Sequence, residues 1–231
     1  MPSRHFGASN PRKPHLVVGP GGLAAEIYDL RQDVDAAFGL LESGGFIRTD
    51  EYPNAAAADD DYFKAAFNGS TSVVTLRASA GDFLFTSAPG GLAREIVITR
   101  SNTPNAFSTG TIKVMGTCYG ENVTLDFVQP NDDGNDVLTS TQRRGLHTIE
   151  EIRIPANLLA TGTFKIGYAA ALGLFGAVKT RAGLAAIFRE VVDGAVVNPP
   201  TATIDGRLYT PAAAPNGAHD YALSYEVDPA G

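Results

Sequence analysis

The sequence contains few of the residues that most often build catalytic and metal centres. Its 231 residues include one cysteine, four histidines, two methionines and no tryptophan. A single cysteine excludes an intramolecular disulfide and a zinc site made of several thiolates. Four histidines scattered along the chain leave little material for a histidine metal cluster. We therefore expect no metal site.

Long apolar runs and an excess of positive charge are also missing. The sequence has no apolar run of about 18 residues, the length that indicates a transmembrane helix. Its first residues lack the apolar stretch of a secretory signal. The net charge of −7 argues against a general nucleic-acid-binding surface. We therefore expect neither a membrane nor a nucleic acid among the partners.

Turn-forming residues, in contrast, are abundant. The chain contains 25 glycines and 14 prolines, while 44% of its residues are hydrophobic. The hydrophobic content is ordinary for a globular protein, so the chain can bury a core. The many turn formers favour short strands over long helices. The length predicts one or two domains.

Residues 1–21 are predicted to form an extended basic arm. Prolines, which fix φ and lack an N–H, recur at Pro2, Pro11, Pro14 and Pro20. The positive charges are Arg4, Arg12 and Lys13, and the first acidic residue is Glu26. One interpretation is a disordered tail. The other is an arm that docks on a neighbouring acidic subunit and becomes ordered only there.

Residues 22–45 contain the best candidate for a helix, which is amphipathic. Its apolar positions follow the alternating spacing of a heptad seam. They are Leu23, Ile27, Leu30, Val34, Ala37 and Leu41. Gly44 and Gly45 then end the pattern. The helix either packs on its own β-domain or joins a self-associating bundle, which would make the protein a homo-oligomer, trimeric or dimeric.

The stretch LVVGPGGLAAEI, residues 16–27, resembles the strand, glycine turn and helix of a dinucleotide site. The context that such a site needs does not follow, because residues 46–69 show no second parallel strand. We therefore expect no cofactor.

Residues 46–71 are predicted to be an acidic linker or loop. Asp50, Glu51 and the run Asp59–Asp61 supply the charge, and alanines separate the two groups. A solvated loop or short helix accounts for this pattern. A cation site is the alternative, although the segment lacks the glycine and the distal glutamate of a calcium loop. The stretch could also receive the basic arm of another copy.

From about residue 72 the apolar pattern changes to a period of two. Segments such as SVVTLR, FLFTS, REIVITR, TIKVMGT, VTLDFV, IEEIRI and TFKIGY are separated by turn material. This pattern predicts a mainly β protein with an antiparallel sandwich or barrel. We assign residues 72–168 to a β-sandwich domain. Residues 169–231 form either a C-terminal β segment packed on it or a second small β-domain.

Residues 94–231 resemble a known family in their order of strands and turns. The matching features in the first part are Gly116-Thr117 at a strand end, the turn Tyr119–Asn122 and the strand centred on Ile149–Ile154. Those in the second part are Asp193-Gly194-Ala195, Ile204-Asp205, Ala214-Pro215-Asn216-Gly217, His219-Asp220-Tyr221 and Tyr225. The pattern is similar to that of β-sandwich virion proteins of tailed bacteriophages. One departure is that the usual glutamate of the outgoing strand appears here as Leu125 or Asp126.

The resemblance implies a structural part of the particle: a capsid decoration protein, a head fibre or a neck component. It supplies no catalytic residues. It also implies the major capsid protein or other virion subunits as partners, and the virion as the location.

The residues themselves offer little chemistry. The sequence contains neither a G-x-S-x-G elbow nor an H-E-x-x-H motif. His147, Glu150 and Glu151 lie on a predicted strand, where Glu150 points away from the other two. We expect an exposed sheet face there, and a half-buried, unreactive Cys118.

Two further polar groups have simpler interpretations as turns. Arg143-Arg144 is either a solvated turn or a contact with another subunit. Three aspartates, Asp132, Asp133 and Asp136, lie in a glycine-containing loop, where turn chemistry explains them.

Three classes of function remain. The first is a virion structural protein, and it accounts for most features of the sequence. Within this class we expect a capsid decoration or minor capsid protein that binds the shell through its arm and helix. A neck or tail-fibre protein is the alternative. A carbohydrate-binding or adhesion module needs exposed aromatic residues, for which tyrosines are available. An enzyme would need convergent carboxylates or a metal, and we expect no enzymatic activity.

Overall fold

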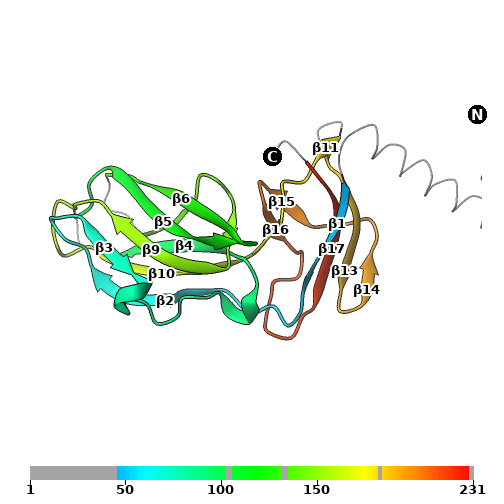
Figure 1. Cartoon of the computed structure of the whole chain (residues 1–231), viewed down its shortest axis with the longest axis horizontal. Helices are drawn as coiled ribbons and strands as arrows, with labels where there is room; N and C mark the ends of the chain where they lie inside the picture. The colour runs from blue at the N-terminus through cyan, green and yellow to red at the C-terminus, as the bar shows by residue number, and fades with distance from the viewer. Residues whose placement is uncertain (1–45, 102–105, 132–134, 182–183, 229–231) are drawn as a thin grey trace, which may run out of the picture. The chain divides into compact units, whose positions relative to one another are not determined.

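The computed structural model describes residues 46–101, 106–131, 135–181 and 184–228 of the chain. The residues from Ile47 onward form one compact unit. This unit is mainly β, and its strands pair in antiparallel sheets (Figure 1). The predicted mainly β, antiparallel class is therefore confirmed. The predicted arm and helix, residues 1–21 and 22–45, lie outside the described residues.

The elements follow one another closely along the chain. The first are β1 (Phe46–Tyr52), β2 (Asp59–Asn68), β3 (Val74–Arg77), the short 3-10 helices η2 (Ala78–Ala80) and η3 (Pro89–Gly91), β4 (Arg94–Ser101), β5 (Gly110–Cys118) and β6 (Glu121–Gln129). The next are β7 (Asp136–Thr139), β8 (Gly145–Leu146), β9 (Thr148–Ile154), β10 (Thr163–Gly173), β11 (Thr180–Arg181) and β12 (Leu184–Ala185). The last are β13 (Ile187–Val192), β14 (Ala195–Val197), β15 (Thr203–Asp205), β16 (Leu208–Thr210) and β17 (Tyr221–Val227).

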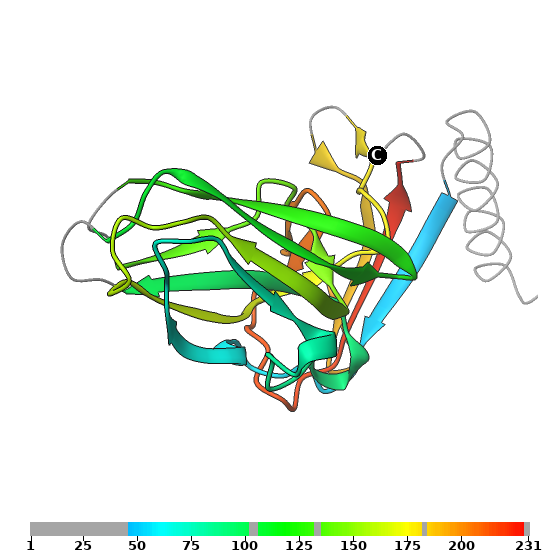
Figure 2. The ribbon, with the colours of Figure 1, turned by 60° about the vertical axis from the view of Figure 1, so that its left-hand side comes forward.

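Two sheets share a first core. The β5 sheet has the order β3-β9-β5-β6, and the β10 sheet has the order β15-β16-β10-β4-β7, with β2 also on β10 and β8 on β4. Alternate side chains of both sheets turn inward, as a period of two requires. Val114 and Leu125 of the β5 sheet and Ile98 and Ile166 of the β10 sheet are all buried in this core. Figures 1 and 2 show the strands of the two sheets facing each other.

A third sheet encloses a second core. This β17 sheet has the order β1-β17-β13-β14 (Figure 1). In β17 (YALSYEV), Tyr221, Leu223, Tyr225 and Val227 lie on one face, and all four are buried in this core. Leu172, near the end of β10, is buried there too, so β10 contributes to both cores.

Two tight turns make the expected hairpins. Tyr119 and Gly120 have φ of 49° and 82° in the β5–β6 turn, and Asp193 and Gly194 have 52° and 78° in the β13–β14 turn. Positive φ at both central residues is the geometry that matches the twist of two-residue hairpins. Both turns belong to the segments that carry the resemblance.

The prediction of an acidic linker at residues 46–71 is wrong. This segment contains β1 and β2, and β2 pairs with β10 through Lys64↔Ile166 and Phe67↔Phe164. Acidic residues suggested a solvated segment, but β1 buries Asp50 and β2 buries Phe63.

The predicted domain boundary at residues 168/169 also fails, since it falls inside β10 (Thr163–Gly173). Moreover, β1 lies beside β17, so the C-terminal sheet includes a strand from the segment assigned to the linker. Residues 83–87, expected as a strand, are instead irregular apart from an isolated bridge between Ser87 and Thr148.

A β-bulge alters the expected facing of β9. Gly116 pairs with Ile149 and Met115 pairs with Glu151, so Glu150 is an extra residue opposite β5. Ile149 and Ile152 are consequently both buried, and Ile149 does not share the face of Glu151 as simple alternation predicted. Gly116 lies so close to β9 that an added Cβ would be 1.9 Å from the backbone oxygen of Thr148.

Within the described residues, none of the helical segments has the length and apolar character needed to cross a membrane.

Candidate functional site

The residues predicted to make contacts with other subunits lie outside the described part of the chain. They are Arg4, Arg12, Lys13, Leu23, Ile27, Leu30, Val34 and Leu41. The structure therefore tests none of them. It does describe the residues that carry the family resemblance, and it brings several of these together.

The segment Asn216–Tyr221 forms a loop that its own side chains hold. The Asn216 side-chain oxygen accepts hydrogen bonds from the backbone N–H groups of Ala218 and His219, at 2.9 and 3.1 Å. Gly217 has a φ of 86°, which suits glycine. The Tyr221 hydroxyl donates to the backbone oxygen of Ala213 at 3.0 Å. The loop thus has hydrogen bonds of its own in addition to its contacts with other segments.

This loop is joined to the β13–β14 turn by three contacts of Asp193. One carboxylate oxygen of Asp193 lies 2.7 Å from Nδ1 of His219, and the other accepts from the backbone N–H of Asp220 at 2.9 Å. The backbone N–H of Asp193 donates to the Asp220 oxygen at 2.9 Å. The hydrogen bond from the Asp220 backbone, followed by that from His219, holds the pKa of Asp193 below its usual range.

The same loop holds the connection between β1 and β2. The backbone N–H of Asn54 donates to the Asp220 carboxylate at 2.6 Å, and Ala55 exchanges backbone hydrogen bonds with His219 and Gly217 at 3.0 and 2.8 Å. We call these contacts the C-terminal lock, comprising Asn54, Ala55, Asp193, Asn216, Gly217, His219 and Asp220. The lock fastens three segments that are far apart in the sequence.

Because of the C-terminal lock, the thermal stability of the protein should depend measurably on pH. A carboxylate whose pKa is lowered by folding stabilises the protein above its unfolded pKa, and this stabilisation is lost as the pH falls through the folded value. We expect the melting temperature to fall more steeply between about pH 5 and pH 2 for the natural sequence than for Asp193→Asn. Glu150→Gln, which alters an exposed carboxylate of β9, is the control and should leave the slope unchanged. Equal slopes for the natural protein and Asp193→Asn would contradict the role given to Asp193.

A second polar group joins β1 to β17 and to the segment after β10. Asp50 is buried, and one of its oxygens accepts from the Tyr225 hydroxyl at 2.7 Å and from the backbone N–H of Phe175 at 3.0 Å. Its other oxygen pairs with Nε of Arg48 at 2.6 Å. The Arg48 guanidinium lies over the Phe175 ring, 3.9 Å from its centre. Burial, followed by the hydrogen bond to Asp50, raises the pKa of Tyr225.

Tyr119 of the predicted turn takes part in the same region. Its hydroxyl and that of Tyr52 both donate to the backbone oxygen of Gly173, at 3.1 and 2.9 Å. The backbone N–H of Tyr119 donates to Nδ1 of His147 at 3.1 Å. His147 is half-buried rather than exposed, and burial lowers its pKa. These tyrosines and His147 therefore have structural partners.

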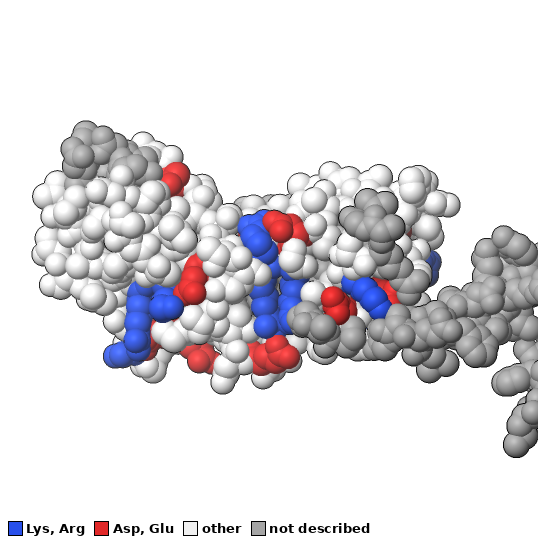
Figure 3. All heavy atoms as spheres, turned by 90° about the horizontal axis from the view of Figure 1, so that it is seen from above, with Lys and Arg blue, Asp and Glu red and all other residues white. Residues whose placement is uncertain are grey.

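The remaining polar candidates are also paired within the chain. Arg143 bonds to Glu95 and to Asp205, both at 2.5 Å, and Arg144 pairs with Glu121. The Arg143-Arg144 pair is thus an internal tie between strands rather than a solvated turn. Figure 3 shows Lys and Arg side chains next to Asp and Glu on the visible face.

Two other predictions concern single groups. Asp136 forms a bidentate pair with the buried Arg100, at 2.6 and 2.7 Å, which goes beyond the turn role expected for it. Cys118 is fully buried, and burial raises the pKa of its thiol, which agrees with an unreactive residue.

The acidic run of β2 is compact. Carboxylate oxygens of Asp59, Asp60 and Asp61 lie within 4.8 Å of one another. The Lys165 ammonium lies 3.3 Å from Asp60 and 3.9 Å from Asp61, so β10 supplies a counter-charge. This ion pair explains why β2 tolerates three adjacent aspartates.

Sequence reasoning missed the pairing of Asp193 with His219 and the burial of Asp50. The only signal for Asp50 was the alternation of Arg48, Asp50 and Tyr52, which places the three on one strand face.

In the comparisons, no protein-family model, no curated protein and no solved structure matches the chain.

Proposed function

We propose that the protein is a structural component of a tailed-bacteriophage virion, a capsid decoration or minor capsid protein. The observation that carries the proposal is the C-terminal lock. Two of the stretches that resemble virion proteins, Asp193–Ala195 and Ala214–Tyr221, contact each other although about twenty residues separate them. A resemblance in two separate stretches is more informative when both belong to one folded feature. The lock also gives these residues a structural role.

The parts that attach the protein to the particle are, in this proposal, the arm and the helix that precede the β structure. Arg4, Arg12 and Lys13 supply the charge that an acidic shell surface attracts. The seam of apolar residues at 22–41 joins copies into a trimer or dimer. The β structure, of the sandwich type, then projects from the particle. The major capsid protein is the proposed partner.

The arm can be tested with the full-length chain. Replacing Arg4, Arg12 and Lys13 together by glutamate should abolish binding to capsids assembled without the protein, because the attraction to the shell becomes repulsion. Binding is measured by co-sedimentation, and circular dichroism checks that the β structure is retained. Deletion of residues 1–21 should have the same effect.

A matched variant controls for the change in net charge. Lys113, Arg77 and Arg153 are partly exposed cations on the β5 sheet, so their joint replacement by glutamate should leave binding intact. Equal binding of the arm variant and the natural protein would refute shell attachment through the arm. The number of copies per particle then separates a decoration protein, present in hundreds, from the alternative of a neck or tail-fibre protein, present in a dozen or fewer.

A further inference from the structure

An exposed aromatic surface lies over β2. We call it the aromatic shelf; it consists of Tyr62 on β2 and of Leu84, Phe85, Thr86 and Ser87 from the segment between η2 and η3. Phe85 is 53% exposed and Leu84 is 62% exposed. Two neighbouring large apolar side chains that are exposed to water form a candidate surface for binding a ligand.

The shelf is held in place from below by backbone hydrogen bonds. Leu84 donates to Phe63 of β2 at 2.8 Å, and Thr86 accepts from Ile149 of β9 at 2.8 Å. Ala88 donates to His147 at 2.7 Å. The irregular segment is thus fixed to both sheets of the first core. A surface that is ordered before binding loses little conformational entropy when a ligand arrives.

The rings of the shelf are ordered as well. Phe85 stacks on Tyr62, with ring centres 4.5 Å apart and planes 17° apart. Tyr62 in turn meets the edges of Phe63 and Tyr168, with centres 5.1 and 5.2 Å apart. Stacking on Tyr62 occupies one face of Phe85, while half of its surface stays exposed. Contacts with other rings thus fix the orientation of the exposed ring.

A shallow hollow adjoins the rings. Its volume is about 380 Å³, at the lower end of small-ligand sites, and the shelf lines it together with Ala88, Pro89 and Gly90. Thr86 and Ser87 bring hydroxyl groups, each able to donate and to accept hydrogen bonds. Partial burial, followed by the charge of Asp59, raises the pKa of Tyr62.

We propose that the aromatic shelf binds a saccharide. A pyranose ring has one face of C–H groups, which can lie on the exposed face of Phe85, and a rim of hydroxyls, which can bond to Thr86 and Ser87. The combination of a flat ring, a shallow hollow and polar groups at its edge fits this amphipathic shape. The hydroxyls of Thr86 and Ser87, which line the hollow beside the rings, favour a hydroxyl-rich ligand over an apolar peptide.

The test uses the full-length protein labelled for NMR. The probes are maltotetraose, cellotetraose, chitotriose and a galactan oligosaccharide, each titrated to about 10 mM, since single-site stacking gives millimolar affinity. We expect at least one probe to shift the ring signals of Tyr62 and Phe85. Phe85→Ala should weaken the binding of that probe about threefold to tenfold, the factor expected for the loss of one aromatic stacking contact.

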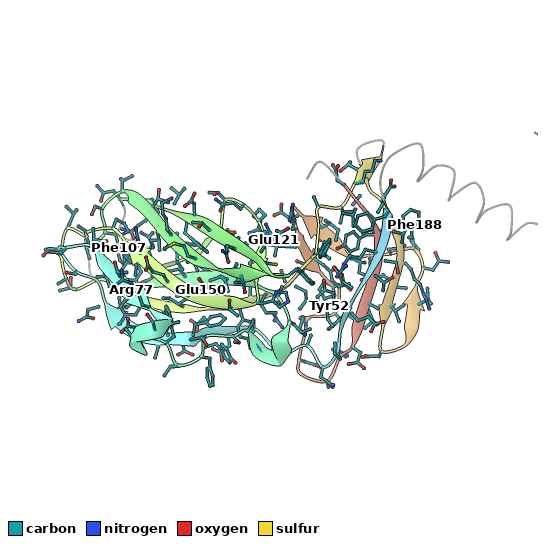
Figure 4. All side chains as sticks on the ribbon, viewed as in Figure 1. Tyr52, Arg77, Phe107, Glu121, Glu150 and Phe188 are labelled. Carbon is teal, nitrogen blue, oxygen red and sulfur yellow. The ribbon has the colours of Figure 1, made fainter. Side chains whose placement is uncertain are left out.

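Phe188→Ala is the matched control. Phe188 is 48% exposed, close to the value for Phe85, but it lies on β13 in the β17 sheet (Figure 4). Its replacement should leave saccharide binding unchanged.

Two outcomes would overturn the proposal. One is an equal weakening of saccharide binding by both variants, and the other is no shift of the ring signals with any of the four probes. Shifts of the same rings by an apolar peptide such as a leucine-rich decamer, but by none of the saccharides, would show a protein-docking surface instead. None of these measurements involves the particle, so the result is independent of shell attachment.

Discussion

Replacing Asp50 by alanine should lower the free energy of unfolding by about 2–5 kcal/mol, because two buried donors lose the carboxylate that accepts their hydrogen bonds. Asp50 is 4% exposed and accepts from the Tyr225 hydroxyl and the Phe175 backbone while pairing with Arg48. Without the carboxylate, a buried hydroxyl and a backbone N–H lose their acceptor, and each such loss costs about 1–3 kcal/mol. The guanidinium of Arg48 also loses its partner. Urea unfolding measures the effect.

The neighbouring Glu51 provides the control for this prediction. It is exposed on the same strand, so Glu51→Ala should change the free energy of unfolding by no more than about 0.5 kcal/mol. Asp50→Asn retains an oxygen that can accept from Tyr225 but no charge for Arg48, and its loss should be intermediate. A loss below about 1 kcal/mol for Asp50→Ala would show that these donors find other acceptors.

Replacing Arg94 by methionine should instead stabilise the protein, by about 1–3 kcal/mol. Arg94 is fully buried, yet only one of its nitrogens has a hydrogen bond, to the Ala169 backbone oxygen at 2.9 Å. Among the described residues no carboxylate pairs with it. Its guanidinium lies 4.6 Å from the centre of the Tyr168 ring, which compensates part of the charge. Burial lowers the pKa of Arg94 to about 10, so folding disfavours its charged form.

Arg100 is a matched comparison for Arg94 on the same strand. It is equally buried, but Asp136 holds it with two hydrogen bonds and it lies over the Phe107 ring. Arg100→Met should therefore destabilise the protein, by about 1–3 kcal/mol, because it leaves Asp136 without its partner. Opposite signs for the two substitutions in the same unfolding assay are the expected result. A loss of stability for Arg94→Met would mean that Arg94 has a compensating partner.

The regular strands could be predicted from the sequence because their alternation is uninterrupted. In β5 and β6 apolar side chains alternate with polar ones, and the turn between them carries residues suited to positive φ. The prediction failed where acidic residues suggested a solvated segment, as in β1 and β2. There the strand is stabilised by partners such as β10 and β17, which are about a hundred or more residues away. Local propensity does not contain that information.

The polar sites show the same limit. Asp193 and His219 were both noted as parts of the resemblance, but their pairing depends on how β17 lies against β13. The bulge at Glu150 was equally hidden, since one extra residue leaves no mark on composition. The aromatic shelf was missed because the residues FLFTS alternate as in a strand. In the structure the backbone of this segment is instead hydrogen-bonded to two different sheets, and the side chains of Leu84 and Phe85 are exposed.

The position of β1 beside β17 determines when the third sheet can form during synthesis. Ile47 and its neighbours leave the ribosome well before Tyr221–Val227 are made. The order β1-β17-β13 therefore leaves β1 without its neighbour until β17 has been made. The first core, from β2 to β10, lacks this constraint and can assemble on the growing chain. Until β17 is made, β1 lacks its neighbouring strand, and its unpaired backbone groups are open to a chaperone or to another copy of the chain.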